Sequence, residues 1–251
     1  MVHFVGAGPG ATDLITVRGR SLLTEADVII YAGSLVNPEH LKLAKEGCAV
    51  YDSASMTLEQ VVEVMAEAEA SGRMTVRLHT GDPSIYGAIR EQMDLLFQRG
   101  IPFEVTPGVS SFCGAAASLK AEYTLPEVSQ TVIITRMAGR TPVPEKEEIS
   151  LLASHQATMA IFLSTGMLEA LSERLMAGGY GAKTPAAIVY KATWPEERVF
   201  YATVGSLARV ARENDVKKTA LILVGEFLGD SYERSKLYHP AFTHEFREAS
   251  E

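Results

Sequence analysis

The sequence predicts an α/β fold in two lobes, and three features of the chain predict it. Short apolar runs alternate with longer helical stretches, glycine-rich turns follow several of the runs, and residues 118–127 interrupt the pattern near the middle. Strands separated by helices pair in parallel through right-handed crossovers, so each lobe should be a sheet flanked by helices. The chain of 251 residues is long enough for one large domain or two of ordinary size.

The first lobe is expected to span residues 1–117. Its expected strands are Val2–Val5, Asp27–Tyr31, Ala49–Tyr51, Met74–Leu78 and Phe103–Thr106. Its expected helices are Asp13–Thr24, Thr57–Gly72, Tyr86–Arg99 and a helix of small residues that includes 114–117. The second of these has the clearest ends, because Thr57 and Gln60 have capping-box spacing and Gly72 closes the helix.

Residues 118–127 have no regular period and end near a proline, so we expect a linker there. The second lobe is then 128–230 and a loosely ordered tail is 231–251, with Tyr238, Phe242 and Phe246 as its aromatic residues. The expected elements are strands Thr131–Thr135, Thr158–Leu163, Ala186–Tyr190, Val199–Thr203 and Ala220–Val224, and helices Met167–Gly178 and Leu207–Glu213. Because Val199–Thr203 and its neighbours are short enough to pair antiparallel, we expect a mixed sheet.

Composition limits the possible partners and the location of the chain. The formal charge is 23 − 31 = −8, which argues against a nucleic-acid surface. No run approaches 18 uncharged apolar residues, and the first residues carry no basic flank, so we expect neither a membrane span nor a signal peptide. The two cysteines, Cys48 and Cys113, are too few for a disulfide framework or a zinc site, so we expect a cytoplasmic protein.

The first glycine turn, Gly6–Ala11, directly follows the first strand. It fits a dinucleotide fingerprint in part, as Gly6-x-Gly8-x-x-Ala11. However, Pro9 removes an amide donor, and the second strand ends without an acidic residue to hold a ribose. A dinucleotide site is therefore disfavoured, and a tight turn that binds no ligand stays open as an alternative.

The second turn, His79–Gly87, also follows a strand and opens a helix, which is where ligands bind in α/β proteins. Asp82 is suited to accept hydrogen bonds from ribose hydroxyls or to cap the following helix, and on its own pattern the cap is favoured. His79 either packs in the core or faces a substrate.

The third turn, Thr106–Ser111, is again a strand followed by a turn and a helix. Ser110 and Ser111 either cap that helix or contact a ligand. Because all three turns follow strands of one parallel sheet, we expect them to meet at a single sheet edge.

These turns resemble those of the tetrapyrrole methylases, which methylate ring carbons of uroporphyrinogen III and precorrins with S-adenosylmethionine. The blocks that carry the resemblance are Gly6-Ala-Gly-Pro-Gly10, Gly81-Asp-Pro83 and Pro107-Gly-Val-Ser110. Four further blocks resemble the branch that acts on C11 of precorrin-4, namely Tyr31-Ala-Gly-Ser-Leu-Val36, Arg77-Leu-His-Thr-Gly-Asp-Pro83, Thr135-Arg136 with Gly139-Arg-Thr-Pro-Val-Pro144, and Tyr190-Lys-Ala-Thr-Trp-Pro195. The similarity covers residues 2–228.

The resemblance implies a two-lobed fold with the cofactor in a cleft between the lobes, a homodimer, and a first glycine turn that borders the tetrapyrrole. Carried over by position, the cofactor contacts are Pro9, Thr80, Gly81, Asp82, Ile85, Tyr86, Ser110, Ser111, Phe162, Leu163, Ala192, Thr219 and Ala220. At the Leu163 contact this chain departs from the family, which often has Met-Gly where this chain has Leu163-Ser-Thr-Gly166.

The expected substrate is precorrin-4 or cobalt-precorrin-4, a polycarboxylate that needs cations near its site. Arg18, His79, Lys120, Arg136, Arg140 and Lys191 are the candidates, with solvated surface charge as the alternative reading. Methyl transfer from a sulfonium needs no metal ligands, and no residue stands out as a catalytic base. Two alternatives remain: methylation at another ring carbon and, more weakly, an NAD-dependent oxidoreductase.

Overall fold

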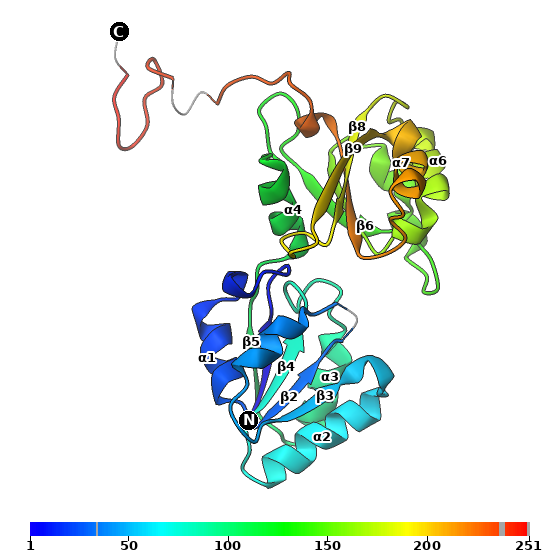
Figure 1. Ribbon diagram of the computed structural model, residues 1–251. Helices are drawn as coiled ribbons and strands as arrows, with labels where there is room; N and C mark the ends of the chain where they lie inside the picture. The colour runs from blue at the N-terminus through cyan, green and yellow to red at the C-terminus, as the bar shows by residue number, and fades with distance from the viewer. Residues whose placement is uncertain (34, 236–238, 250–251) are drawn as a thin grey trace. The chain divides into compact units, whose positions relative to one another are not determined.

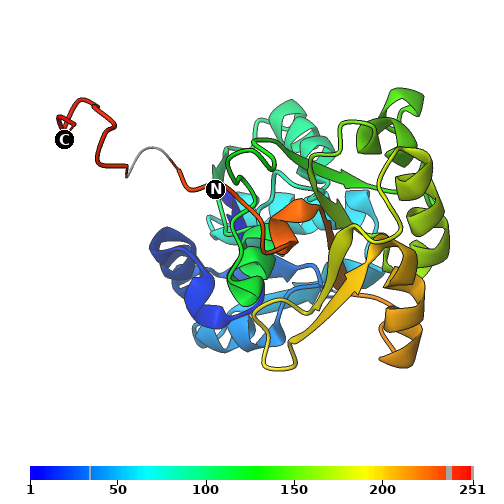
Figure 2. The same ribbon diagram turned by 90° about the horizontal axis from the view of Figure 1, so that it is seen from above.

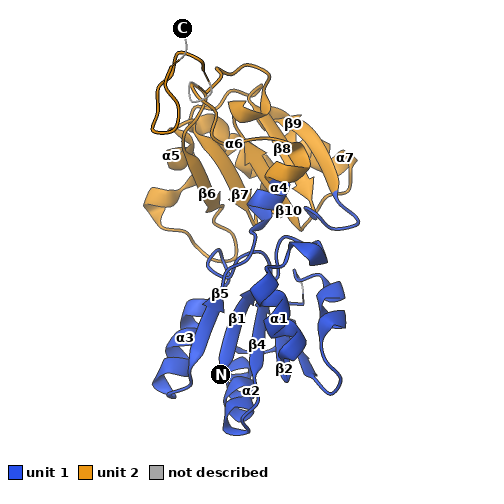
Figure 3. Ribbon diagram, turned by 90° about the vertical axis from the view of Figure 1, so that its left-hand side faces the viewer, with its two compact units in different colours: residues 1–115, 191–197 blue, residues 116–190, 198–251 orange. Residues whose placement is uncertain are grey.

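The computed structural model describes residues 1–33, 35–235 and 239–249, which fold as two compact units. Unit 1 contains residues 1–115 and 191–197, and unit 2 contains residues 116–190 and 198–251 (Figure 3). The return of residues 191–197 to unit 1 differs from the uninterrupted second lobe expected at 128–230. Residues 118–127 also belong to unit 2, and helix α4 (Ser111–Leu119) runs into this segment.

Unit 1 is built on a parallel sheet of five strands in the order β3-β2-β4-β1-β5 (Figure 1). The strands are β1 (Val2–Gly6), β2 (Val28–Tyr31), β3 (Ala49–Asp52), β4 (Thr75–His79) and β5 (Phe103–Thr106). Helices α2 (Leu58–Ala70) and α3 (Ile89–Gln98) pack on the face that carries Phe4 and Ile30. Helix α1 (Val17–Glu25) packs on the opposite face, against Val5 and Leu78.

Unit 2 contains a mixed sheet of five strands in the order β6-β7-β10-β8-β9. The strands are β6 (Val132–Arg136), β7 (Thr158–Phe162), β8 (Pro185–Tyr190), β9 (Arg198–Thr203) and β10 (Ala220–Val224). Only β6 and β7 pair in parallel, whereas β10 runs antiparallel to β7 and β8, and β9 runs antiparallel to β8. The expectation of a mixed second sheet is therefore confirmed.

One face of the second sheet is covered by α5 (Ile149–Ala153), α6 (Leu168–Ala177) and α7 (Leu207–Glu213), as Figure 2 shows from above. Met159 and Ile188 of the strands form a core with Leu171 and Leu175 of α6. Buried apolar area of this kind is the main favourable term in folding.

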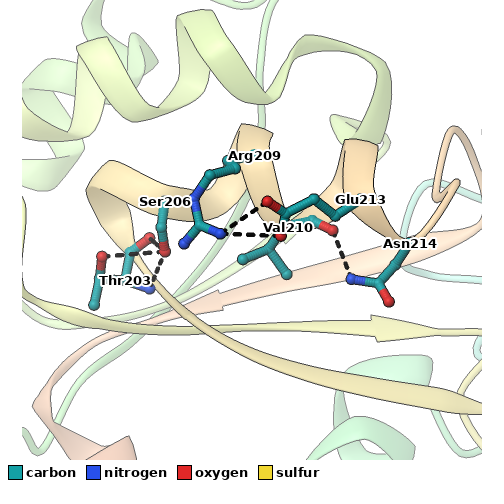
Figure 4. A network of polar contacts seen from close by, with 6 residues as sticks. All are labelled: Thr203, Ser206, Arg209, Val210, Glu213 and Asn214. Carbon is teal, nitrogen blue, oxygen red and sulfur yellow. Dashed lines mark hydrogen bonds and ion pairs between the residues drawn. The ribbon is translucent and has the colours of Figure 1, made fainter.

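Polar contacts hold α7 at both ends (Figure 4). Before the helix, the Thr203 amide donates to Ser206 Oγ at 2.9 Å. On the exposed side Arg209 pairs with Glu213 one turn later, and after the helix the Asn214 side-chain amide donates to Val210 O at 2.9 Å. The observed bounds of α7 agree with those expected from the sequence.

Two expected helices begin later than the sequence pattern indicates. The first starts at Val17, because the Thr16 side chain accepts from the Gly19 amide as an N-cap, and only a 3-10 turn (Thr12–Leu14) precedes it. The other starts at Ile89, because Ala88 has a left-handed φ of 49°. The 3-10 segment Pro38–Leu43 and helix α5 lie where the sequence reading placed no element.

The expected cap of α2 is confirmed: Thr57 and Gln60 form a reciprocal capping box.

In the tail, an isolated bridge pairs His244 with Arg247. Two residues singled out in the sequence, Ser34 and Tyr238, lie outside the described residues. In the described part of the chain no helix combines the length and the apolar character that a membrane crossing requires.

Candidate active site

The three glycine turns of unit 1 meet at the carboxyl edge of its parallel sheet, as the sequence predicts. The Ala7 amide donates to His79 O at 2.7 Å, which joins the first turn to the end of β4. The Gly81 amide donates to Gly8 O at 2.8 Å, and the Gly8 amide donates to Gly81 O at 3.3 Å. The first and second turns are therefore paired backbone to backbone.

The third turn packs so closely on the other two that side chains are excluded. A Cβ atom on Gly108 would lie 2.2 Å from Gly81 O, and one on Gly6 would lie 2.6 Å from the Gly108 Cα. Gly81 also has a φ of +59°, a conformation that favours glycine. The glycines thus permit three backbone segments to approach one another at this edge of the sheet.

Asp82 joins the second turn to the third. Its Oδ1 accepts from the Ser84 amide at 2.8 Å, and its Oδ2 accepts from the Gly108 amide at 2.8 Å. Partial burial raises the pKa of Asp82, but the hydrogen bonds from Ser84 and Gly108 outweigh it and leave the pKa below its usual value. The helix-cap interpretation is wrong, because α3 begins at Ile89 and Asp82 instead bonds within and between turns.

Arg77 and His79 alternate with Val76 and Leu78 along β4, so their side chains lie under the α2–α3 layer. The Arg77 guanidinium donates to Gln92 Oε1 at 3.1 Å and to Ile30 O at 3.2 Å. The Gln92 amide donates in turn to Ala88 O at 3.0 Å. Burial lowers the pKa of Arg77 to about 10. This series of contacts holds Ala88, the left-handed residue that directly follows the second turn.

His79 is buried, with 4% of its surface exposed, and stacks on Phe4 with ring centroids 6.1 Å apart. Burial, with a smaller contribution from the Arg77 charge, lowers the pKa of His79 to about 3, so the ring is neutral. Of the two roles that the sequence left open, this environment favours the packed core residue over the substrate contact.

The cofactor positions that the resemblance assigns to unit 1 all lie on or beside the three turns. They are Pro9 on the first turn, Thr80, Gly81, Asp82, Ile85 and Tyr86 on the second, Ser110 and Ser111 on the third, and Ala192 in the returning segment. Tyr86 is partly exposed and has a φ of 55°, which is uncommon for an aromatic residue. Ser110 is buried, and its carbonyl accepts the Gly114 amide at the start of α4.

Residues 191–197 pack against the first turn, although they are far from it in the sequence. The Trp194 Nε1 donates to Pro9 O at 3.2 Å, and the Ala11 amide donates to Thr193 Oγ1 at 3.0 Å. Ala192 is buried beside the same turn, because a Cβ on Gly10 would lie 2.9 Å from Ala192 O. Sequence reasoning missed Thr193 and Trp194 as site residues, although they stand in a block that resembles the C11 branch.

The cofactor positions assigned to unit 2 are also brought together. Strand β7 pairs antiparallel with β10, and continuing this register places Leu163 opposite Ala220. Thr165 Oγ1 donates to Ala220 O at 3.0 Å across the same strand ends. Leu163 and Thr219 have φ values of 52° and 57°, and the Leu163 side chain is exposed, whereas Phe162 is half-buried. Backbone strain of this kind is often found at functional sites.

The expected substrate cations differ in their environments. Arg136 binds the loop that follows β6, because its Nη1 donates to Met137 O and Thr141 O at 3.1 Å and its Nη2 donates to Pro142 O at 2.7 Å. Arg140 is exposed on this loop. Arg18 on α1 and Lys120 after α4 are also exposed.

Lys191 lies beside the returning segment itself. Its Nζ is 4.8 Å from the Trp194 ring centroid and 3.7 Å from Glu196 Oε2. In the described part of the chain, His, Cys, Asp and Glu side chains form no cluster of three or more that is suited to a metal ion.

The carboxyl edge of a parallel sheet, where these glycine turns gather, is the usual place for a ligand in an α/β protein. The chain belongs to the tetrapyrrole (corrin/porphyrin) methylases, whose family model matches residues 1–208. Both the resemblance and the two-lobed α/β class are therefore confirmed.

Several relatives match almost the whole chain. The chain is 53% identical over 249 residues to a cobalt-precorrin-4 C(11)-methyltransferase of Methanocaldococcus jannaschii, covering 99% of this chain and 96% of that one. It is 44% identical to a precorrin-4 C(11)-methyltransferase of Pseudomonas aeruginosa, with 98% of each chain covered.

Two solved structures are similar to the whole fold. A cobalt precorrin-4 methyltransferase superposes with a TM-score of 0.89 at 46% identity, over 91% of this chain and 96% of that one. A uroporphyrin-III C-methyltransferase of Thermus thermophilus, in complex with S-adenosylhomocysteine, superposes with a TM-score of 0.74 at 26% identity, over 91% and 93%.

Proposed function

We propose that this chain transfers a methyl group from S-adenosylmethionine to C11 of a precorrin-4 macrocycle in cobalamin biosynthesis. One observation carries this proposal: relatives that are named for this reaction are 41–53% identical to the chain and cover at least 94% of it. The relatives named for the cobalt form are 53% and 46% identical, against 41–44% for those named for precorrin-4, which favours cobalt-precorrin-4 as the substrate.

The residues present fit a ligand of this kind. The close approach of Gly6, Gly81 and Gly108 brings three turns together at the sheet edge where α/β proteins bind ligands, and Asp82 joins two of these turns. S-adenosylmethionine supplies the methyl group: its sulfonium S–CH3 bond breaks as a bond to the ring carbon forms, and S-adenosylhomocysteine is released. The ring carbon is the nucleophile, so the contribution of the protein is to orient the reactants and to exclude water.

The cofactor contacts named from the resemblance remain part of this proposal, with Pro9, Asp82 and Ala192 in unit 1 and Leu163 and Ala220 in unit 2. Arg140 and Lys191 are proposed to bind substrate carboxylates, since guanidinium and ammonium groups are the natural partners of a polycarboxylate.

We further propose a homodimer in the cytoplasm that binds no nucleic acid, as the resemblance and the charge of −8 imply. Light scattering of the purified chain tests the dimer.

The decisive experiment is to incubate the purified chain with S-adenosylmethionine and either cobalt-precorrin-4 or precorrin-4. We expect mass spectrometry to detect one added methyl group, with faster turnover of the cobalt form, and NMR to assign that group to C11. A methyl group on another ring carbon supports the alternative specificity. Product formation that requires a nicotinamide cofactor and leaves S-adenosylmethionine unchanged contradicts the proposal.

A further inference from the structure

The segment 191–197 forms a compact loop that is bonded to itself. The Trp194 amide donates to Lys191 O at 3.0 Å, and the Glu197 amide donates to Trp194 O at 3.0 Å. Lys191 and Thr193 have φ values of 47° and 67°, which are unusual for residues other than glycine. Strained conformations persist only where the surroundings determine them strongly, so the shape of this loop is closely specified.

The loop holds the first glycine turn from one side. Gly10 is in direct contact with Trp194, since a Cβ on this glycine would lie 2.0 Å from the ring atom Cδ1. The Trp194 Nε1–H binds Pro9 O, and Thr193 Oγ1 accepts the Ala11 amide, so hydrogen bonds on both sides of Gly10 come from the loop. Figure 3 shows the loop in the colour of unit 1.

Two other elements also hold the first turn. The Asn37 side-chain amide donates to Gly10 O at 2.9 Å. Gly114 of α4 lies against Pro9, because a Cβ there would be 2.8 Å from the Pro9 Cβ. The first turn therefore moves relative to the loop only if the contacts of Thr193 and Trp194 break.

We propose that Trp194 is a positioning residue for methyl transfer, which fixes Pro9 and Ala192 relative to each other at the cofactor. This inference rests on the proposed function, which assigns both positions to S-adenosylmethionine. Trp194 reaches Pro9 through a hydrogen bond and lies two residues from Ala192 in the same loop, so one side chain determines the spacing of the two contacts. Thr193 supports it through the Ala11 amide.

The test uses two conservative variants and one severe variant of the full chain. Trp194→Phe keeps an aromatic ring but loses the N–H bond to Pro9, and Thr193→Val keeps the shape but loses the acceptor for Ala11. We expect each to weaken S-adenosylhomocysteine binding about fivefold in calorimetry, as the loss of one hydrogen bond implies. Trp194→Ala should weaken S-adenosylhomocysteine binding more than Trp194→Phe does. The affinity that phenylalanine restores measures the packing of the ring. The affinity that it does not restore measures the hydrogen bond that positions Pro9.

The matched control is Thr203→Val, which removes a hydroxyl contact to Ser206 in unit 2, far along the chain from the turns (Figure 4). It should lower the melting temperature to a similar degree as Thr193→Val and leave the cofactor affinity unchanged. Trp194 is the single tryptophan of the chain, so its emission gives a second readout. We expect the emission of the wild-type chain to change as S-adenosylhomocysteine is added.

Wild-type affinity and kinetics in both Trp194→Phe and Thr193→Val overturn the inference, as does an affinity loss that Thr203→Val reproduces. Neither result affects the proposed function, because the wild-type chain still binds S-adenosylhomocysteine and methylates its substrate. If the wild-type chain itself neither binds nor methylates, the proposed function fails, and that outcome is seen before any variant is made.

Discussion

At the residue scale, Asp82 is the clearest case of a side chain whose role depends on two partners. Its two oxygens accept the amides of Ser84 and Gly108. Asp82→Asn provides only one acceptor oxygen, so one of these amides loses its partner. We expect a loss of about 1–3 kcal/mol in the free energy of unfolding, together with weaker S-adenosylhomocysteine binding. Urea denaturation and calorimetry measure the two effects.

A matched control is Asp94→Asn, which removes the charge from an exposed i,i+4 pair with Arg90. Exposed pairs contribute roughly 0–1 kcal/mol, so this variant should lose little stability and no affinity. If Asp82→Asn behaves like Asp94→Asn in both measurements, the carboxylate is not what joins the second and third turns.

Arg136 and Arg140 lie close together in the sequence, but their side chains have different environments in the structure. Arg136 holds three backbone carbonyls with its guanidinium, whereas Arg140 is exposed. We expect Arg136→Lys to raise the Michaelis constant for the tetrapyrrole despite the retained charge, because an ammonium lacks the planar fork. Arg140→Lys should retain substrate binding better than Arg140→Ala. Steady-state kinetics with both substrates varied checks this.

Cofactor affinity is the control for the two arginines, because neither is assigned to S-adenosylmethionine. An exposed contact by Arg140 contributes roughly 0.2–1 kcal/mol and weakens with salt. Wild-type kinetics in Arg136→Lys together with a loss in Arg136→Ala would show that charge alone matters at this position and would contradict the loop-holding role.

At the element scale, regular patterns in the sequence located most strands and helices to within a few residues. The capping box of α2 was predictable because it depends on local spacing. The start of α3 was not predictable, because it is set by the buried contacts from Arg77 through Gln92 to Ala88, which span two strands and a helix.

The candidate site shows the same division between local and long-range information. The meeting of the three turns follows from the parallel order of their strands, and this was predicted. The place of Thr193 and Trp194 was not predicted, because nothing local to residues 191–197 indicates that they bond to Pro9 and Ala11.

The close packing of the three turns predicts the effect of adding a side chain to one of their glycines. In Gly108→Ala the new Cβ would lie 2.2 Å from Gly81 O, so the third turn must move away from the second. We expect about 1–3 kcal/mol of destabilisation and a clear loss of S-adenosylhomocysteine affinity. The control is Gly181→Ala, where the nearest atom is 3.7 Å from the new Cβ. Equal behaviour of the two variants in thermal unfolding and calorimetry would contradict the tight-packing argument.

At the scale of the whole molecule, buried histidines should make folding sensitive to acid. His40 is fully buried, and burial lowers its pKa. Burial lowers the pKa of His79 to about 3. In the unfolded chain both rings titrate near 6.5, so below that pH the unfolded state binds more protons than the folded state, and for His79 this difference persists down to about pH 3. Stability is then complete above pH 6.5 and falls as the pH is lowered toward 3.

We therefore expect the free energy of unfolding to fall by roughly 1 kcal/mol per pH unit for His79 between about pH 6.5 and 3, with a further loss in the same direction from His40. Urea denaturation of the full chain at a series of pH values from 7.5 to about 4 measures the slope. His79→Phe, which keeps an aromatic ring beside Phe4 but cannot be protonated, should have a shallower slope whatever its stability at neutral pH. If His79→Phe keeps the wild-type slope, protonation of His79 is not what opposes folding in acid, and the buried ring would have to be accessible to solvent in the folded state.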